Sequence, residues 1–250
     1  MKHIRVVGLC LVAVLAFGVV AVASASAAER PEFKLCGKAA KEPKGSEHKY
    51  SGSFKNKSCT EPEAGGKYEL EEVPSGTKLT VKSKGSVLTV AGKVIKCKKD
   101  TGTGELIGSH SVAIGVTFEG CAVNGSKSDP CESEGAGAGK IVQHATYALV
   151  WLNEAETEPV VETIGEPTFK CGAETLEVQG DALGAIANTS KGTAITFAVN
   201  GSGEQQYKHY WNSFRHEEEE EEVRLYTEPG GVEATEATVE EMTWKGVGVY

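Results

Sequence analysis

From about residue 77 onward, apolar and polar residues alternate with a period of two. The stretches 78–82, 112–119 and 195–200 show this pattern most clearly. Successive side chains of a β-strand point to opposite faces, so the alternation predicts strands with one buried and one solvated face. In the segment 141–152 both sets of alternate positions contain apolar residues. A short helix is one interpretation, but the β-branched and aromatic content favours a central strand that is covered on both sides.

Short turn signals separate the predicted strands. They are Pro74-Ser75-Gly76, Lys84-Gly85, Asn124-Gly125, Asn200-Gly201 and Pro229-Gly230-Gly231. Many short strands separated by such turns predict an all-β fold, an antiparallel sandwich or barrel, over residues 76–250. The final part of that range, 232–250, is again strand-like.

The first residues have the three parts of a secretory signal peptide. A positively charged start at 2–5 precedes an uncharged apolar run over 6–23, and small residues at 24–28 offer a cleavage site. A membrane anchor is the alternative, but the run is at the short limit of the roughly 20 residues that a span requires. We therefore expect residues 1–28 to be removed. The mature chain is then secreted or extracellular, with a cell-wall association as one option, and no membrane span is expected in it.

Six cysteines remain beyond the predicted signal peptide. Exported proteins keep disulfides, so this even number predicts three bridges. Fifteen pairings are possible, and position along the chain suggests Cys36–Cys59, Cys121–Cys131 and Cys97–Cys171. The stretch 34–72 is rich in Lys, Gly and Ser and has few large apolar side chains. We therefore expect residues 29–75 to form a small N-terminal segment stapled by the first of these bridges.

Charge is distributed unevenly along the mature chain. Residues 29–99 carry a net charge of +7, whereas residues 100–250 carry −18. The basic half could contact an anionic wall polymer, or basic and acidic strands could lie side by side and neutralise each other. Nucleic acid is not expected as a partner, because the chain is acidic overall and has no nucleic-acid-binding motif.

Catalytic and metal-binding motifs are not found in the sequence. The chain has no G-x-S-x-G nucleophile motif, phosphate-binding loop or dinucleotide fingerprint. The cysteines do not have the C-x₂₋₄-C spacing of zinc sites. We therefore expect no enzyme activity, no metal and no cofactor. The six consecutive acids at 217–222 are typical of a solvated loop.

Four aromatic residues precede this acidic run: Tyr207, Tyr210, Trp211 and Phe214. Exposed aromatic side chains on a β-fold can stack on the face of a sugar ring, so they are candidate binding residues for a polysaccharide or cell-wall polymer. The alternative is that they form an apolar patch that fixes a long loop to the rest of the protein.

Several short motifs around the cysteines form a pattern with a wider resemblance. They include Cys36-Gly37-Lys38-Ala39, Lys57-Ser58-Cys59-Thr60, the stretch 101–108 and Phe118-Glu119-Gly120-Cys121. The pattern resembles a group of secreted, cysteine-containing, β-rich proteins of soil actinobacteria that has no assigned function. The resemblance implies export and β-structure, and it transfers no catalytic residue.

The sequence therefore predicts a secreted or cell-wall-associated β protein with a binding or structural role and no catalysis. The first alternative is a secreted carbohydrate-active hydrolase, which would need two carboxylates facing each other in a cleft. The second is an envelope component that self-associates through its oppositely charged halves.

Overall fold

The computed structural model describes residues 30–250 except 190–191, 213–216, 219–221, 229–230 and 245–246. The predicted signal peptide, Phe214 and part of the acidic run therefore lie outside the described residues. The described part of the chain consists of β-strands and their connections, with no helix. Consequently, within these ranges no helix of the length and apolarity needed to cross a membrane is found. The prediction of an all-β fold is confirmed.

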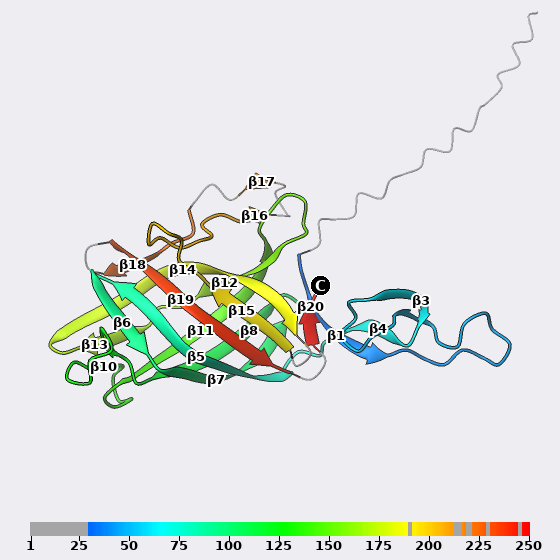
Figure 1. Cartoon of the computed structure of the whole chain (residues 1–250), viewed down its shortest axis with the longest axis horizontal. Helices are drawn as coiled ribbons and strands as arrows, with labels where there is room; N and C mark the ends of the chain where they lie inside the picture. The colour runs from blue at the N-terminus through cyan, green and yellow to red at the C-terminus, as the bar shows by residue number, and fades with distance from the viewer. Residues whose placement is uncertain (1–29, 190–191, 213–216, 219–221, 229–230, 245–246) are drawn as a thin grey trace, which may run out of the picture.

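Eight antiparallel strands close into a barrel (Figure 1). They are β5 (Lys78–Val90), β7 (Lys99–Gly108), β8 (Ser111–Glu119), β11 (Lys140–Trp151), β12 (Pro159–Ile164), β14 (Glu174–Thr189), β15 (Gly192–Phe197) and β19 (Val232–Thr243). Each pairs with the next in this order, and β19 pairs back to β5. Of the two predicted architectures, the barrel is therefore the one observed. Closure leaves these eight strands without an open sheet edge.

Shorter strands extend one end of the barrel. They are β6 (Lys93–Cys97), β9 (Ala122–Val123), β10 (Cys131–Glu132), β13 (Thr168–Cys171) and β18 (Leu225–Glu228). β6 pairs with β5 and β9, β13 pairs with β10 and β14, and β18 pairs with β14 and β19. We call this end, on the left in Figure 1, the disulfide end, because two of the three disulfides lie there. On the outside of the barrel, β16 (Trp211–Asn212) pairs with β11 and with β17 (Glu217–Glu218).

A second sheet lies at the opposite end (Figure 1). It contains β1 (Phe33–Lys38), β2 (Gly52–Phe54), β3 (Pro62–Gly66), β4 (Tyr68–Glu72) and β20 (Val247–Val249), in the order β20-β1-β4-β2-β3. Residues 29–75 thus contribute four strands, and the fifth comes from the far end of the sequence. The Phe33 and Trp244 rings pack edge to face with centroids 4.9 Å apart, and Tyr250 Oη donates a hydrogen bond of 2.5 Å to Ser58 O. The ring contact links the second sheet to the end of β19, and the hydrogen bond links the C-terminus to the β2–β3 connection within the second sheet.

The alternating pattern places every second side chain of the barrel strands in its core. Val112, Ile114, Val116 and Phe118 of β8 are all buried, as the pattern predicts. The segment 141–152 is a strand, β11, as expected. Tyr147 and Leu149 point into the barrel, whereas Val150 on its outer face is buried in a second apolar cluster. β11 is therefore covered on both faces at this point.

One predicted turn is wrong. Lys84-Gly85 lies inside β5, where the register between β5 and β19 shifts between Thr238 and Glu240. Gly85 has a φ of 144°, a conformation that favours glycine, so the pair forms a β-bulge instead of a turn. At Asn124-Gly125 both residues have positive φ (52° and 74°), as in a tight turn of the predicted kind.

The disulfides confirm one suggested pairing and correct two. Cys36–Cys59 is present, but Cys121–Cys131 and Cys97–Cys171 are wrong, because the structure has Cys97–Cys121 and Cys131–Cys171. Cys131 and Cys171 are direct partners in the β10–β13 ladder, and Cys97 ends β6 beside β9. The pairings follow from strand register, which proximity along the sequence does not reveal.

Non-reducing peptide mapping of the oxidised protein should recover the pairs 36–59, 97–121 and 131–171. Recovery of a disulfide-linked 121–131 pair from the oxidised protein would contradict the structure.

Replacing both Cys131 and Cys171 by Ala should lower the free energy of unfolding by about 4 kcal/mol, because the bridge closes a loop with a sequence separation of 40 residues. Urea denaturation measures this loss.

Candidate functional site: a cavity inside the barrel

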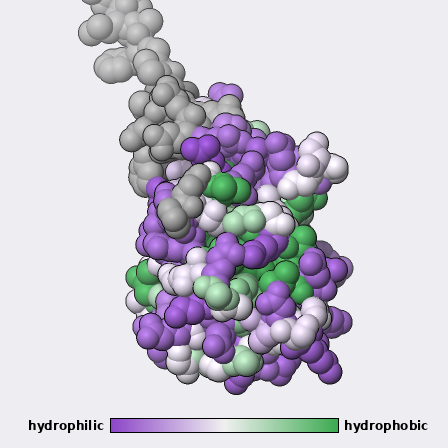
Figure 2. Space-filling model, turned by 90° about the vertical axis from the view of Figure 1, so that its left-hand side faces the viewer, coloured by the Kyte–Doolittle hydropathy of each residue, from purple (hydrophilic) through white to green (hydrophobic). Residues whose placement is uncertain are grey.

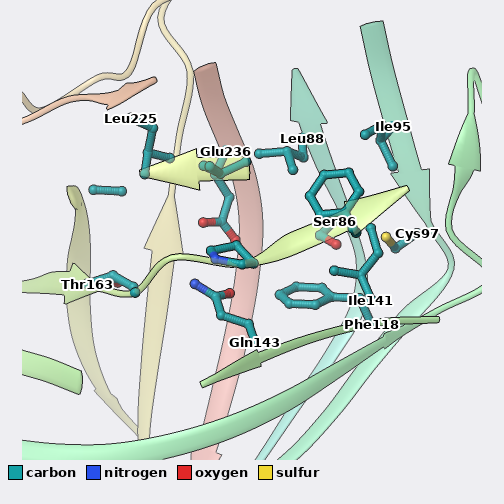
Figure 3. A pocket seen from close by; sticks show the side chains of 15 residues that line it. Ser86, Leu88, Ile95, Cys97, Phe118, Ile141, Gln143, Thr163, Leu225 and Glu236 are labelled. Atoms are coloured by element: carbon teal, nitrogen blue, oxygen red, sulfur yellow. The ribbon is translucent and has the colours of Figure 1, made fainter. Parts of the chain in front are cut away.

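A small cavity lies inside the barrel toward the disulfide end (Figure 3). It offers about 40 Å³ to the centres of water molecules. A cavity needs roughly 10–15 Å³ to hold one water, so this space is large enough to admit water. Most of its wall is apolar and includes Leu88, Ile95, Phe118, Ile141, Phe169 and Val178. Figure 2, which looks onto that end of the molecule, shows hydrophobic residues gathered between hydrophilic ones.

Polar side chains from three barrel strands reach this apolar cavity. In Figure 3, Glu236 of β19 and Gln143 of β11 extend toward each other from opposite walls. Neither side chain has a hydrogen-bond partner among the described residues, although the Glu236 main chain is held by Gln205 at 3.1 and 3.2 Å. Thr163 of β12 is 5% exposed, and its Oγ1 lies near the Tyr147 hydroxyl but has no hydrogen-bond partner within 3.5 Å. The cavity thus presents three polar groups whose hydrogen-bonding capacity is unused within the described structure.

Two further carboxyl groups are fully buried in the barrel interior. Tyr147 Oη donates a hydrogen bond of 2.8 Å to Glu240 Oε2, whereas Glu240 Oε1 has no partner in the described structure. Asp100 accepts hydrogen bonds from Ser83 Oγ and, at 3.3 Å, from Ser86 Oγ. None of the ion pairs formed by the described residues includes Asp100, Glu236 or Glu240. The interior therefore holds three acids without a compensating cation in the described part of the chain.

This environment favours the protonated acids. Burial, followed by the charges of Glu240 and Asp100, raises the pKa of Glu236 from 4.5 to about 8. Burial also raises the pKa of Glu240 to about 7, although the Tyr147 hydrogen bond opposes the shift. The pKa of Asp100 is raised by burial against the lowering effect of its serine partners. Near neutral pH, Glu236 is therefore mainly uncharged.

The aromatic residues predicted as a binding site lie elsewhere, on the outside of the barrel. Tyr207 and Tyr210 are partly buried against a cluster of Val150, Val160, Leu183 and Val223. Trp211 begins β16 and is paired with Trp151 of β11. Phe214 falls outside the described residues. The packing of the two tyrosines supports a role in fixing this segment to the barrel, and sugar binding by these residues stays a prediction.

An open groove borders this outer segment. Tyr210, Tyr226, Glu162, Asp181, Glu222 and Arg224 line it. Glu222 Oε1 is 2.8 Å from Lys208 Nζ, and this bond is the main cause of the lowered pKa of Glu222. Burial and the nearby charge of Glu166 raise the pKa of Asp181. The groove therefore combines two aromatic rings with acids in different electrostatic environments.

Opposite charges from the two halves of the sequence meet on the barrel surface. Lys78 pairs with Glu105, Lys93 with Glu174, and Lys99 Nζ lies 2.8 Å from Glu119 Oε2. These pairs bear out the interpretation that basic and acidic strands neutralise each other. Within the described ranges, no group of three or more His, Cys, Asp or Glu residues could hold a metal ion.

Comparisons with known proteins find no match, whether with protein-family models, curated proteins or solved structures.

The inward-facing acids were not identified from the sequence, although it contains a usable signal. In 232–250 the apolar residues Val239 and Met242 indicate a strand, but they are three apart and so belong to opposite faces. Met242 is 1% exposed and Val239 is 51% exposed. Counting back from Met242 in steps of two reaches Glu240 and Glu236. Residues an even number apart in a strand share a face, so both acids belong to the same face as the buried methionine.

Replacing Glu236 by Gln should stabilise the protein at alkaline pH. Below about pH 4.5 this carboxyl is protonated in both the folded and the unfolded state. Between pH 4.5 and about pH 8 it ionises mainly in the unfolded chain, so a rise in pH over this range favours unfolding. Glutamine does not ionise, so the variant does not lose this folding stability as the pH rises. The melting temperature of E236Q should exceed that of the wild type by at least a few degrees at pH 8, with little difference at pH 4.5.

Glu241 provides the matched control, because it is exposed on the outer face of the same strand. E241Q should melt like the wild type at both pH values. If E236Q and the wild type have parallel pH profiles, the Glu236 carboxyl is not held in the protonated form.

Proposed function

We propose that the protein is a non-catalytic binding protein that acts outside the cytoplasm and holds one small, mainly apolar molecule inside its barrel. The observation that carries this proposal is the interior cavity with its three polar side chains that have no hydrogen-bond partner among the described residues. An eight-stranded barrel has an interior that side chains can fill completely or that can hold one small ligand. Here the side chains leave space, and the polar groups that border it could fix the orientation of a ligand.

The energetic argument concerns these polar groups. A buried group without a hydrogen bond costs about 1–3 kcal/mol, so side chains such as Thr163 normally find partners in protein or water. Water can occupy the cavity in the free protein. A ligand that displaces this water while making the same hydrogen bonds also gains from contact with the apolar wall.

Three features support a role outside the cytoplasm. The three disulfides are typical of an oxidising compartment. The predicted signal peptide and the resemblance to secreted actinobacterial proteins lead to the same proposal. The absence of catalysis is proposed because, among the described residues that line the cavity, Glu236 alone carries a carboxyl group, whereas acid–base hydrolysis of a glycoside requires two.

A ligand-observed NMR screen of small fragments should detect binding to the wild type and weaker binding to Ala182→Val. Ala182 lines the cavity and is 1% exposed, so the two added methyl groups occupy space that a ligand would need. The control is Ala113→Val on the outer face of β8, which should bind like the wild type. Thermal melts establish that both variants fold. Equal binding by A182V and A113V would place the ligand elsewhere and refute the proposal.

A secreted carbohydrate-active hydrolase is the second candidate, and the outer groove is where it would act. Glu162 and Asp181 lie on the paired strands β12 and β14, within two residues of being direct partners. Together with Tyr210 and Tyr226 they could form a sugar site. Release of reducing sugar from a polysaccharide by the wild type, and its loss in D181N, would favour this candidate. Our main proposal expects no release by either protein.

A further inference from the structure

We propose that the cavity selects the ammonium group of a short primary alkylamine. This inference rests on the proposed function, because it assigns a chemical class to the ligand of the same cavity. The carboxylate of Glu236 accepts a hydrogen bond from the ammonium, and the alkyl chain lies against the apolar wall.

The polar groups around the cavity include enough acceptors for an ammonium. A primary ammonium has three N–H donors and no acceptor. Glu236, the amide oxygen of Gln143 and Thr163 Oγ1 provide three acceptors, from three different strands. In Figure 3 the polar ends of Glu236 and Gln143 point toward the same part of the cavity, where a bound ammonium would meet them. An alcohol has a single O–H donor and leaves part of this acceptor set unused.

The charges of the groups around Glu236 also favour an ammonium. The groups that face Glu236 are Glu240 on its own strand, Asp100 on β7 and Tyr147 on β11, all of which are neutral or negative. No Lys or Arg of the described residues pairs with these acids. In an interior of low dielectric constant, a cation is attracted by every ionised acid and an anion is repelled. A ligand with a carboxylate head group is therefore disfavoured.

The space limits the size of the amine. A volume of about 40 Å³ is only a few times the roughly 10–15 Å³ that a single water needs, so it admits only a few non-hydrogen atoms. This suits an ammonium with two or three carbons, such as propylammonium. So few atoms can give only millimolar to high-micromolar affinity.

Proton release should accompany binding. In the free protein, Glu236 has a pKa of about 8 and keeps its proton at neutral pH. An ammonium stabilises the carboxylate form, so the proton leaves to solvent while the ammonium stays charged. The apparent affinity should therefore rise roughly fifty-fold between pH 6 and pH 8, following the ionised fraction of Glu236.

The test is isothermal titration of the full disulfide-bonded protein with propylammonium chloride at pH 6 and pH 8. Buffers of different ionisation enthalpy report the released proton. Propan-1-ol is the neutral ligand of matched size. We expect propylammonium to bind more tightly than propanol at pH 8, E236Q to lose this preference, and E241Q to keep it. Thermal melts confirm that both variants fold.

The outcomes separate the two proposals. If propanol or other neutral fragments bind in a manner sensitive to A182V while propylammonium does not, the amine inference is wrong and the binding function stands. If neither class binds, both proposals fail. Propylammonium binding that E236Q leaves unchanged, or that shows no increase with pH, also overturns the inference.

Discussion

Closure of the barrel between β19 and β5 is the constraint on which the rest of the structure depends. Once the ring is closed, every second residue of a strand must face the interior, whatever its polarity. On β19 this parity buries Met242 and Ala234, and it places Glu240 and Glu236 among the same apolar neighbours. The cost of burying acids is reduced by protonation and by hydrogen bonds from Tyr147, Ser83 and Ser86. The polar interior is thus a direct consequence of strand register in a closed sheet.

The two ends of the barrel are covered by different structures. At one end, Phe33 and Trp244 pack together beneath the second sheet. At the other, Cys97–Cys121 and Cys131–Cys171 hold the short strands β6, β9, β10 and β13 beside the cavity. Ile95 and Cys97 on β6 and Phe169 on β13 are part of the cavity wall. These two disulfides therefore shape the wall of the proposed binding site as well as stabilising the fold.

Local features of the sequence were sufficient to predict much of the fold. The alternation at Leu79 and Val81, and again from Val112 to Phe118, identified strands and their inward faces because one face of each is uniformly apolar. The same reasoning did not locate Glu236, since its strand carries acids and apolar residues on both faces, and the pairing with β5 and β15 shows that the face of Met242 is the inner one. Two of the three cysteine pairs were missed for a related reason. Cys131 meets Cys171 through a ladder between strands that are distant in sequence, and only the assembled sheet defines that register.

The pairing of β20 with β1 also affects how the molecule can be assembled. Tyr250 reaches Ser58 across a sequence separation of 192 residues, so the sheet that contains β1 lacks its last strand until nearly all of the chain is available. Contacts of such high contact order are slow to form, because a long loop must close before they contribute. A polypeptide translocated from its N-terminus would therefore keep β1 exposed at an unpaired edge throughout transit. Such a protein would benefit from a chaperone that covers this edge until β20 is available.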